Sequence, residues 1–354
     1  MLHSLHMNRT LVALLALVVA VAVQPAHGQS DEDRGPIAFD DAFTITDETV
    51  LEGDETVPLT AIINPHVTAE RIYLADYQSH QIALYDHDGT RLAEAGQLGQ
   101  GPGDVQMPFE VKPGLDAEEI FVYERGNMRI QVFDDALNHV AMWGRGAVQT
   151  EHLFPVEHGG RSRMVTIGPN ACESSICAVR VYDAEGNPLQ GMASIDETPF
   201  SATWKGDVAG DTVYVANVQE PVVQSYTLEG EHVVSFPVDS PSTAFLEAES
   251  ERYDSREAFM ADRRDLLSRP HSIIRDLFVH QNYVFVQHEN KNRGDDAPRY
   301  FLDVFDREGT LLAHGIETPG VLGSVTDAFY FTQDDYGPDF GRLTIRRAEL
   351  NADW

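Results

Sequence analysis

Short segments that alternate apolar and polar residues recur along the chain at nearly constant intervals. The segment RIYLADYQSHQIALYDHDGTRLAEAG (71–96) aligns with EIFVYERGNMRIQVFDDALNHVAMWG (119–144) at a spacing of 48 residues. Alternation with a period of two predicts half-buried β-strands, so each copy predicts a β-rich unit. The remaining copies, the last of them more divergent, are 163–192, 211–236, 282–315 and 327–350.

An aromatic residue marks the same position in five of the copies. These residues are Tyr85, Phe133, Tyr182, Tyr226 and Phe305. In four copies a glycine follows four residues later, as Gly89, Gly186, Gly230 and Gly309. Because glycine accepts positive φ, DHDG and its relatives predict tight hairpin turns between strands. They do not match the calcium-loop pattern D-x-[DN]-x-[DN]-G-x5-E.

The spacing of the aromatic residues predicts the fold. Successive intervals are 48, 49, 44 and 79 residues, and a four-stranded propeller blade spans about 40–45 residues. We therefore expect an all-β fold, a six-bladed β-propeller of four-stranded antiparallel blades. The long interval contains 240–272, rich in Ala, Glu, Leu and Arg, which predicts a helical insertion between blades 4 and 5 that caps the loop-rich face. The N-terminal run 37–50 is predicted to supply the last outer strand and close the ring.

Two of the units also resemble known proteins in sequence. The stretches IYLADYQSHQIALYDHDG with GQLGQGPGDVQMP, and ERGNMRIQVFD, resemble NHL-repeat propellers and, more closely, the secreted bacterial six-bladed β-propeller family. The resemblance extends over most of 37–350, although the later units match mainly in period and aromatic positions. It implies the fold and a binding role, and it implies no particular reaction.

The N-terminus has the pattern of an export signal. An apolar run of thirteen residues, 11–23, is followed by small residues at Ala26 and Gly28. This pattern predicts a signal peptide over 1–28 and a propeller domain over 29–354. A membrane anchor is the alternative, but thirteen residues are too few to span a bilayer. We expect a periplasmic or secreted protein whose mature chain does not insert into a membrane.

The charge balance limits the partners. The net charge is −32, and the only lysines are Lys112, Lys205 and Lys291. Such a field repels nucleic acid and anionic membranes, so we expect neither as a partner. An acidic, lysine-poor surface also suits a salt-loving organism, because salt screens the self-repulsion. A GC-rich genome that favours arginine codons is the alternative explanation of the scarce lysines.

Cys172 and Cys177 are the only cysteines. A metal site needs more ligands than these two supply. In an exported protein they are predicted to form a local disulfide, with two free thiols as the alternative.

The glycine-rich stretch GQLGQGPGDVQMPFE (96–110) raises the question of a phosphate loop. A P-loop needs G-x-x-x-x-G-K-[ST] leading into a helix, whereas Pro102 and a strand-like segment follow here. We interpret it as a connection between blades. G-x-S-x-G and H-E-x-x-H are also absent, so no catalytic residue, metal or cofactor is predicted. The alternative is a calcium-dependent hydrolase of the lactonase type at the central channel, for which Ca²⁺ would be required.

Loop placement predicts a binding face. In a four-stranded blade, the loop between the second and third strands and the link to the next blade lie at the same end, and the long loops here are of these two kinds. Elaborated loops on a rigid scaffold usually carry function. We therefore expect a monomeric scaffold that binds a small molecule, glycan, peptide or protein there. The candidate contact residues are Asp76, His80, Glu124, Arg125, Asn127 and Arg129. For Asp76 and Glu124 the alternative role is to accept backbone N–H groups of their own loops.

Overall fold

The structure is a computed structural model. It describes residues 35–354 except 116–117, 144–149, 173–175, 196–202, 219, 246–266, 293–298, 336–339 and 352–353. The predicted signal peptide, 1–28, lies outside the described residues. No helix in the described part is long and apolar enough to cross a membrane.

The described chain forms six antiparallel sheets of four strands each. The first three are β2 (Ile62–Val67), β3 (Ile72–Asp76), β4 (Gln81–Tyr85) and β5 (Arg91–Ala95); β6 (Pro108–Pro113), β7 (Ile120–Glu124), β8 (Arg129–Phe133) and β9 (His139–Trp143); and β10 (His152–His158), β11 (Arg161–Ala171), β12 (Ile176–Asp183) and β13 (Pro188–Ile195). The last three are β14 (Trp204–Ala209), β15 (Thr212–Asn217), β16 (Val222–Thr227) and β17 (His232–Pro237); β18 (His271–His280), β19 (Tyr283–Lys291), β20 (Tyr300–Asp306) and β21 (Leu311–Glu317); and β22 (Val321–Val325), β23 (Phe329–Asp335), β24 (Arg342–Leu350) and β1 (Phe43–Glu52).

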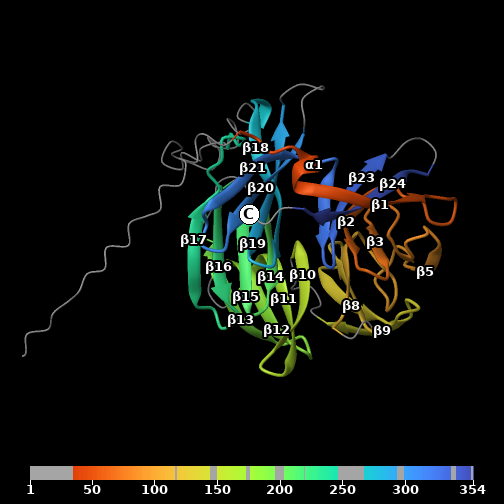
Figure 1. Cartoon of the computed structure of the whole chain (residues 1–354). Coiled ribbons are helices and arrows are strands. Elements are labelled where there is room, and N and C mark those ends of the chain that lie inside the picture. The colour runs from red at the N-terminus through yellow and green to blue at the C-terminus, as the bar shows by residue number, and fades with distance from the viewer. Residues whose placement is uncertain are drawn as a thin grey trace, which may run out of the picture. The chain divides into compact units, whose positions relative to one another are not determined.

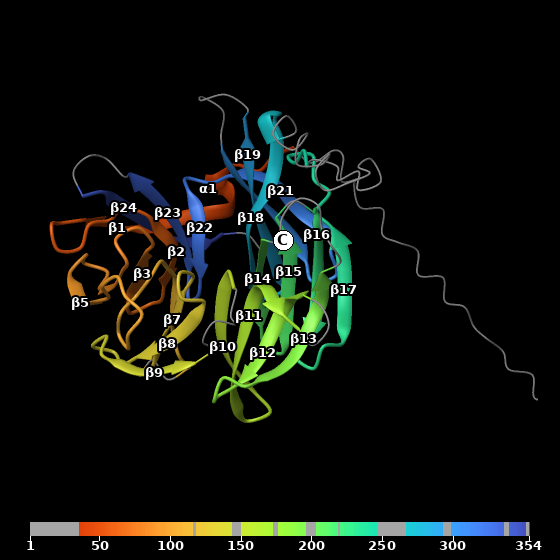
Figure 2. The same cartoon turned by 180° about the vertical axis from the view of Figure 1, so that it is seen from behind.

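The six sheets are arranged around an axis as the blades of a propeller (Figures 1 and 2). The innermost strands are β2, β6, β10, β14, β18 and β22, and each contacts the innermost strands of both neighbouring blades. The predicted fold, six four-stranded blades, is therefore confirmed.

Burial explains why the middle strands of each blade are the most regular part of the sequence. All five residues of β3 and of β8 are buried, because each blade packs between two others. Val111 and Val122 of the second blade lie in one apolar cluster with Tyr73 and Leu84 of the first. By contrast, the outer strand β5 alternates between exposed and half-buried residues.

The predicted hairpin turns are present between the third and fourth strands. Gly89 has φ 81° and Gly309 has φ 94°, a region that favours glycine. In the first blade Asp86 Oδ1 accepts the N–H of Thr90 at 2.7 Å. Asp306 Oδ1 accepts the N–H of Thr310 at the same distance in the fifth. The Asp carboxylate and the glycine thus specify the same turn in different blades.

The N-terminal segment closes the ring, as predicted. β1 pairs antiparallel with β24 and forms the outer edge of the sixth blade. The strand begins later than expected, because Phe39–Ala42 forms a four-residue helix, α1, in place of the predicted strand start. This turn places the Phe39 ring 5.3 Å from that of Phe43 and 5.4 Å from that of Phe331.

The predicted insertion lies between β17 and β18. Most of it, 246–266, is outside the described residues, so its helical content and capping role remain predictions. Its last two residues, His271 and Ser272, belong instead to β18. The described ends of the insertion meet, because Ser272 N donates to Ala244 O at 2.8 Å.

Candidate ligand site in the axial channel

Asp76, one of the predicted contact residues, supports its own loop. It is 3% exposed. Its carboxylate accepts the backbone N–H of Thr60 at 2.6 Å, of Gln78 at 3.0 Å and of Ser79 at 2.9 Å. These bonds match the alternative role given for Asp76 above.

Glu124, Asn127 and Arg129 hold the glycine-rich connection 96–107. Glu124 is fully buried and accepts Arg129 Nε at 2.6 Å and Asn127 Nδ2 at 2.7 Å. The Arg129 guanidinium also donates to the carbonyl oxygens of Gln100 and Gly101, at 2.8 and 3.1 Å. The structure brings these three predicted residues together in a buried network directed at the chain itself.

His80 and Arg125 complete the predicted set. His80 Nδ1 accepts the N–H of Met107 at 3.0 Å, so it also fastens a loop. Arg125 keeps 52% of its side chain exposed and lies over the Phe109 ring, 5.1 Å from the centroid. Of the six predicted residues, Arg125 is the one that lines the axial cavities described next.

Two adjoining cavities lie along the axis. The inner cavity, of about 40 Å³, is lined by residues from all six innermost strands. The mouth cavity, of about 370 Å³, is lined mainly by residues in or just before the first halves of these strands. Arg125 and Val218 from loops between second and third strands, and Thr332, Asp334 and Leu343 of the sixth blade, complete the lining. The mouth cavity therefore opens at the end of the propeller that carries the long loops. Both cavities share the residues Asn64, Pro65, Asp276 and Gly323.

Irregularities in four innermost strands shape the mouth cavity. The ladder register shifts at Asn64 and Pro65 in β2, at Phe109 in β6, at Arg275 in β18 and at Gly323 in β22. All five of these residues line the mouth cavity. A β-bulge bends its strand and redirects a side chain. Here the bulges turn residues toward the axis that a regular strand would direct elsewhere.

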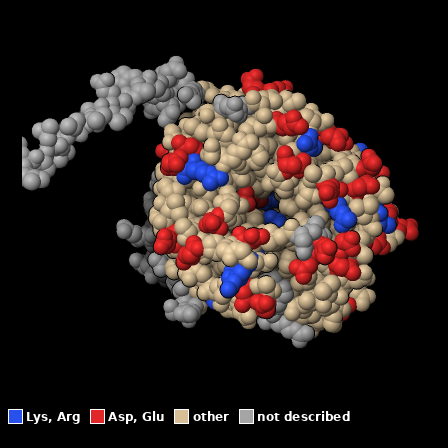
Figure 3. All heavy atoms as spheres, turned by 60° about the horizontal axis from the view of Figure 1, so that its bottom comes forward, with Lys and Arg blue, Asp and Glu red and all other residues tan. Residues whose placement is uncertain are grey.

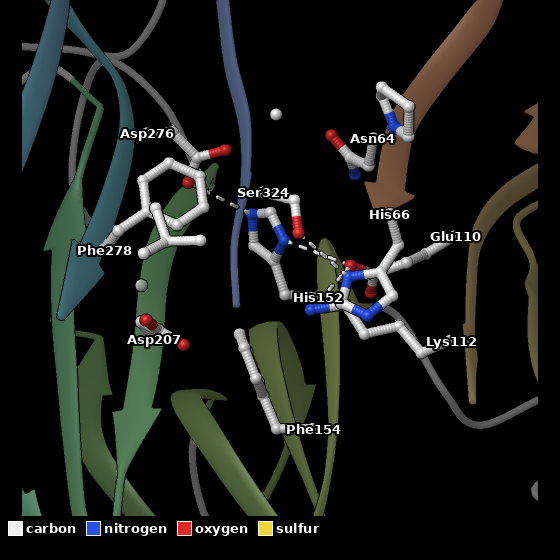
Figure 4. Close-up of a pocket in the computed structure, with 14 residues that line it drawn as sticks. Asn64, His66, Glu110, Lys112, His152, Phe154, Asp207, Asp276, Phe278 and Ser324 are labelled. Carbon is white, nitrogen blue, oxygen red and sulfur yellow. Dashed lines mark hydrogen bonds and ion pairs between the residues drawn. The ribbon is translucent and has the colours of Figure 1, made fainter. Parts of the chain in front are cut away.

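A chain of buried polar groups crosses the channel beside the inner cavity (Figure 4). His152 Nδ1 lies 3.4 Å from Glu110 Oε1, and His152 Nε2 lies 3.3 Å from Lys205 Nζ. Burial and the nearby Lys205 charge lower the pKa of His152 to about 3, so the imidazole is neutral. Burial raises the pKa of Glu110 to about 7, although Lys112, 3.6 Å away, opposes the shift.

Two further titratable groups face the inner cavity (Figure 4). Burial raises the pKa of Asp207 to about 6, even though Asp207 accepts the N–H of Val279 at 2.8 Å. Burial, with the Lys112 charge, lowers the pKa of His66 well below its ordinary value. His66 Nδ1 lies 3.4 Å from the Ser324 hydroxyl. Burial thus shifts the pKa values of Glu110, Asp207, His152 and His66 in the direction that favours their neutral forms.

The two charge signs are nearly balanced in the channel, unlike in the chain as a whole: among the described residues, four basic side chains, Lys112, Lys205, Arg125 and Arg275, and five acidic ones line the cavities. Figure 3 shows red side chains spread over the face in view and blue atoms within its central hollow. Two of the chain's three lysines, Lys112 and Lys205, line the axial cavities. Arg125 and Arg275 line the mouth. In a chain of net charge −32 this placement marks the channel as chemically distinct from the surface.

The described residues contain no group of three or more His, Cys, Asp or Glu side chains placed to hold a metal. Two channel carboxylates are already engaged by backbone groups: Asp207 accepts two N–H groups, and Asp276 Oδ1 accepts that of Leu277 at 2.9 Å. Elsewhere, the structure joins Cys172 and Cys177 in a disulfide.

The sequence analysis did not predict the residues that line the channel, although the sequence contains a pattern that could have identified them. Charged residues interrupt the innermost strands, as Glu110 and Lys112 do in PFEVKP and Lys205 and Asp207 do in WKGDVA. In each pair the residues are two apart and so share one face of a strand. When one face of an innermost strand carries charged residues, the channel that this face lines is expected to be polar.

Comparison with known proteins supports the fold. No family model matches the chain. One stretch of 141 residues is 26% identical to Protein brain tumor of Drosophila melanogaster, covering 40% of this chain and only 13% of that protein. The NHL-repeat resemblance therefore stays a prediction.

Two solved structures are similar over nearly the whole chain. A member of the DUF4221 family from Bacteroides vulgatus has a TM-score of 0.60 at 10% identity, covering 88% of this chain and 98% of its own. A Bacteroides fragilis protein described as a candidate exported protein has a TM-score of 0.65 at 11% identity, covering 90% and 98%. By its fold, this chain is similar to these two bacterial proteins.

Proposed function

We propose that the chain is an exported binding protein that takes a small molecule into the mouth cavity of its axial channel. The observation that carries this proposal is the cavity itself, about 370 Å³ at the loop-rich end of the axis. Small-molecule sites commonly have volumes of roughly 300–1,000 Å³, with apolar walls and a few polar groups. Export agrees with the N-terminal apolar run and with the similarity to the candidate exported protein of Bacteroides fragilis.

The walls of the mouth cavity have this mixed character. Ile274 and Leu322 are fully buried and supply apolar surface, and Lys205, Glu151 and Arg125 supply charge. A glycan or peptide that inserts only one residue would use the same contacts. We favour a small molecule over a glycan or peptide because the inner cavity below the mouth has a volume of only about 40 Å³, so a longer ligand could not extend further along the axis.

A cavity-filling variant tests the proposal. Ile273 lines the mouth and is only half-buried, so Ile273→Trp fills the cavity without disturbing the core. The matched control is Val233→Trp, on the outer strand β17, where Val233 is 53% exposed. Ligands are first identified by thermal shift with the wild-type protein, since binding to the folded state raises its melting temperature. We expect Ile273→Trp to abolish these shifts and Val233→Trp to keep them. Unchanged shifts in Ile273→Trp would contradict the mouth as the site.

The same assay addresses the calcium-dependent hydrolase. The channel carboxylates Asp207 and Asp276 are engaged by backbone N–H groups, which favours binding without a metal. We expect EDTA at fixed ionic strength to leave the melting temperature unchanged. A fall of several degrees that Ca²⁺ restores would instead favour the hydrolase.

A further inference from the structure

Lys205 occupies an unusual place for a lysine. It lies in the innermost strand β14, where it pairs with Ala216, and it is only 7% exposed. It nevertheless lines the mouth cavity. Lysine is almost never this buried unless its charge is paired.

The other two lysines each have a carboxylate partner. Lys112 Nζ lies 3.6 Å from Glu110, and Lys291 Nζ lies 2.6 Å from Glu289. For Lys205 no carboxylate of the described residues lies within 4.0 Å of Nζ, and its polar contact is His152 Nε2 at 3.3 Å. Among the described residues, the most buried lysine is thus the one with no carboxylate in contact with its ammonium.

His152 orients the Lys205 ammonium. Since the imidazole is neutral, the proton on Nδ1 faces Glu110 and the Nε2 lone pair faces Lys205 Nζ. This contact uses one of the three ammonium N–H groups. Burying an ammonium with so few partners is unfavourable, and a counter-ion at hydrogen-bond distance offsets this cost.

The nearby acids act on Lys205 from beyond 4.0 Å. Glu151 Oε1 faces Arg125 Nη2 at 3.8 Å, and the Lys205 charge opposes the rise that burial causes in the pKa of Glu151 and of Glu110. Asp276 Oδ1 accepts a backbone N–H and lies 3.9 Å from His152 Nε2. Arg125 and Arg275, both exposed, stand on the rim of the cavity. The remaining charged group that lines the mouth, Asp334, is exposed to water.

We propose that the mouth cavity binds a small organic acid whose carboxylate pairs with Lys205. This inference rests on the proposed function and names its ligand class. The apolar part of the acid packs on the cavity walls, which carry Ile62, Ile63, Val218, Ile273, Ile274, Val321 and Leu322. The acidic surface opposes the approach of an anion, but at 0.15 M salt this repulsion is screened beyond about 8 Å, whereas Lys205 acts at contact.

The test compares acids with their neutral amides. The probes are benzoate and phenylacetate against benzamide and phenylacetamide, each titrated into protein labelled with ¹³C and ¹⁵N at lysine. Three lysines give three Nζ signals, so each is followed separately. We expect both acids to shift the Lys205 signal and the amides to leave it unchanged.

Variants then assign the contact. Lys205→Met keeps the length and apolar stem of the side chain and removes the charge. A hydrogen bond to a charged group contributes about 1.5–3 kcal/mol, so calorimetry should show roughly a 10- to 100-fold loss of affinity for the acids. The matched control is Lys291→Met, which lies outside the cavity and should bind as the wild type does.

Each contrary outcome has a distinct meaning. If acids and amides bind the wild type equally, the mouth is a binding site but the acid inference is wrong. If neither binds, the acid inference falls, and a thermal-shift screen without hits would overturn the proposed function as well. If the Lys112 signal moves while that of Lys205 does not, the anion sits in the inner cavity and Lys205 is not its partner.

Discussion

At the scale of single residues, charged side chains in or beside strands have two different roles: some bind the chain itself, and others line the axial cavities. Glu124 and Arg129 have the composition of a ligand site, yet their side chains bind the 96–107 connection. Lys205 lies in the short innermost strand WKGDVA and lines a cavity. Which role a charged residue has depends on the groups that face its side chain in the folded protein, and the local sequence does not show these groups.

The buried Glu124–Arg129 pair leads to a stability prediction. Arg129→Met leaves Glu124 buried and without its main counter-charge, which typically costs 3–5 kcal/mol. We expect a loss of about that size in the free energy of unfolding by urea. The control is Arg346→Met, which removes a surface pair with Glu48 (2.9 Å) and should cost about 1 kcal/mol or less. A loss for Arg129→Met no larger than that of the control would contradict a structural role.

His158 provides a prediction on pH dependence. Its Nδ1 lies 2.7 Å from Asp211 and its Nε2 lies 2.7 Å from Glu229. The hydrogen bond to Asp211, with the charge of Glu229, raises the pKa of His158 above its ordinary value of 6.5. The imidazolium therefore stabilises the fold fully below pH 6.5, and this contribution is lost as the pH rises through the raised folded-state pKa.

Proton NMR of the histidine ring measures this pKa directly. We expect a midpoint above 6.5 for His158, and a pH-dependence of stability that is weaker in His158→Asn. A midpoint at or below 6.5 would show that the two carboxylates do not hold the imidazolium in solution.

At the scale of elements, the strands could be predicted, among them the strand-like segment after Pro102 that forms β6, but the channel that the innermost strands enclose could not. β4 and β8, the third strands of the first two blades, are largely buried, and each ends on the marker aromatic residue, Tyr85 or Phe133. The hairpins carry Asp and Gly because the turn demands them. The innermost strands contain bulges at Asn64, Phe109 and Gly323, which break the alternation that identifies a strand. Each innermost strand contributes only a few residues to the channel. These residues come together only when the six blades close into a ring.

The closing strand β1 is the element on which the ring depends. Phe43 is 1% exposed, and its ring lies 5.0 Å from Phe329 and 5.6 Å from Phe331 of the sixth blade. We expect Phe43→Ala to lower the free energy of unfolding by about 3–5 kcal/mol, because it leaves a cavity between β1 and the core. Ile45→Ala on the same strand, 44% exposed, is the control and should cost less than about 1 kcal/mol. Equal losses in urea unfolding would mean that β1 does not act as a packed strand.

At the scale of the whole molecule, acids are in excess over the chain but nearly balanced by bases in the axial cavities. Acids dominate the surface, while Lys112 and Lys205 lie in the axial cavities, where salt and water reach them least. Screening therefore acts mainly on the repulsion between surface acids and less on the channel contacts. The consequence is that salt should alter the stability of the fold more than it alters the binding of an organic acid at Lys205.

The excess of acids gives the prediction on salt. With a net charge of −32, the compact state is destabilised by its own repulsion at low ionic strength. Raising NaCl from 0.01 to 1 M shortens the screening length from about 30 Å to about 3 Å. We therefore expect the melting temperature to rise steadily across this series. KCl should act as NaCl does, because screening depends on ionic strength and not on a specific ion. A flat or falling melting temperature would show that the acids are spaced widely enough not to repel, and the salt-loving origin expected from the composition would then lose its physical basis.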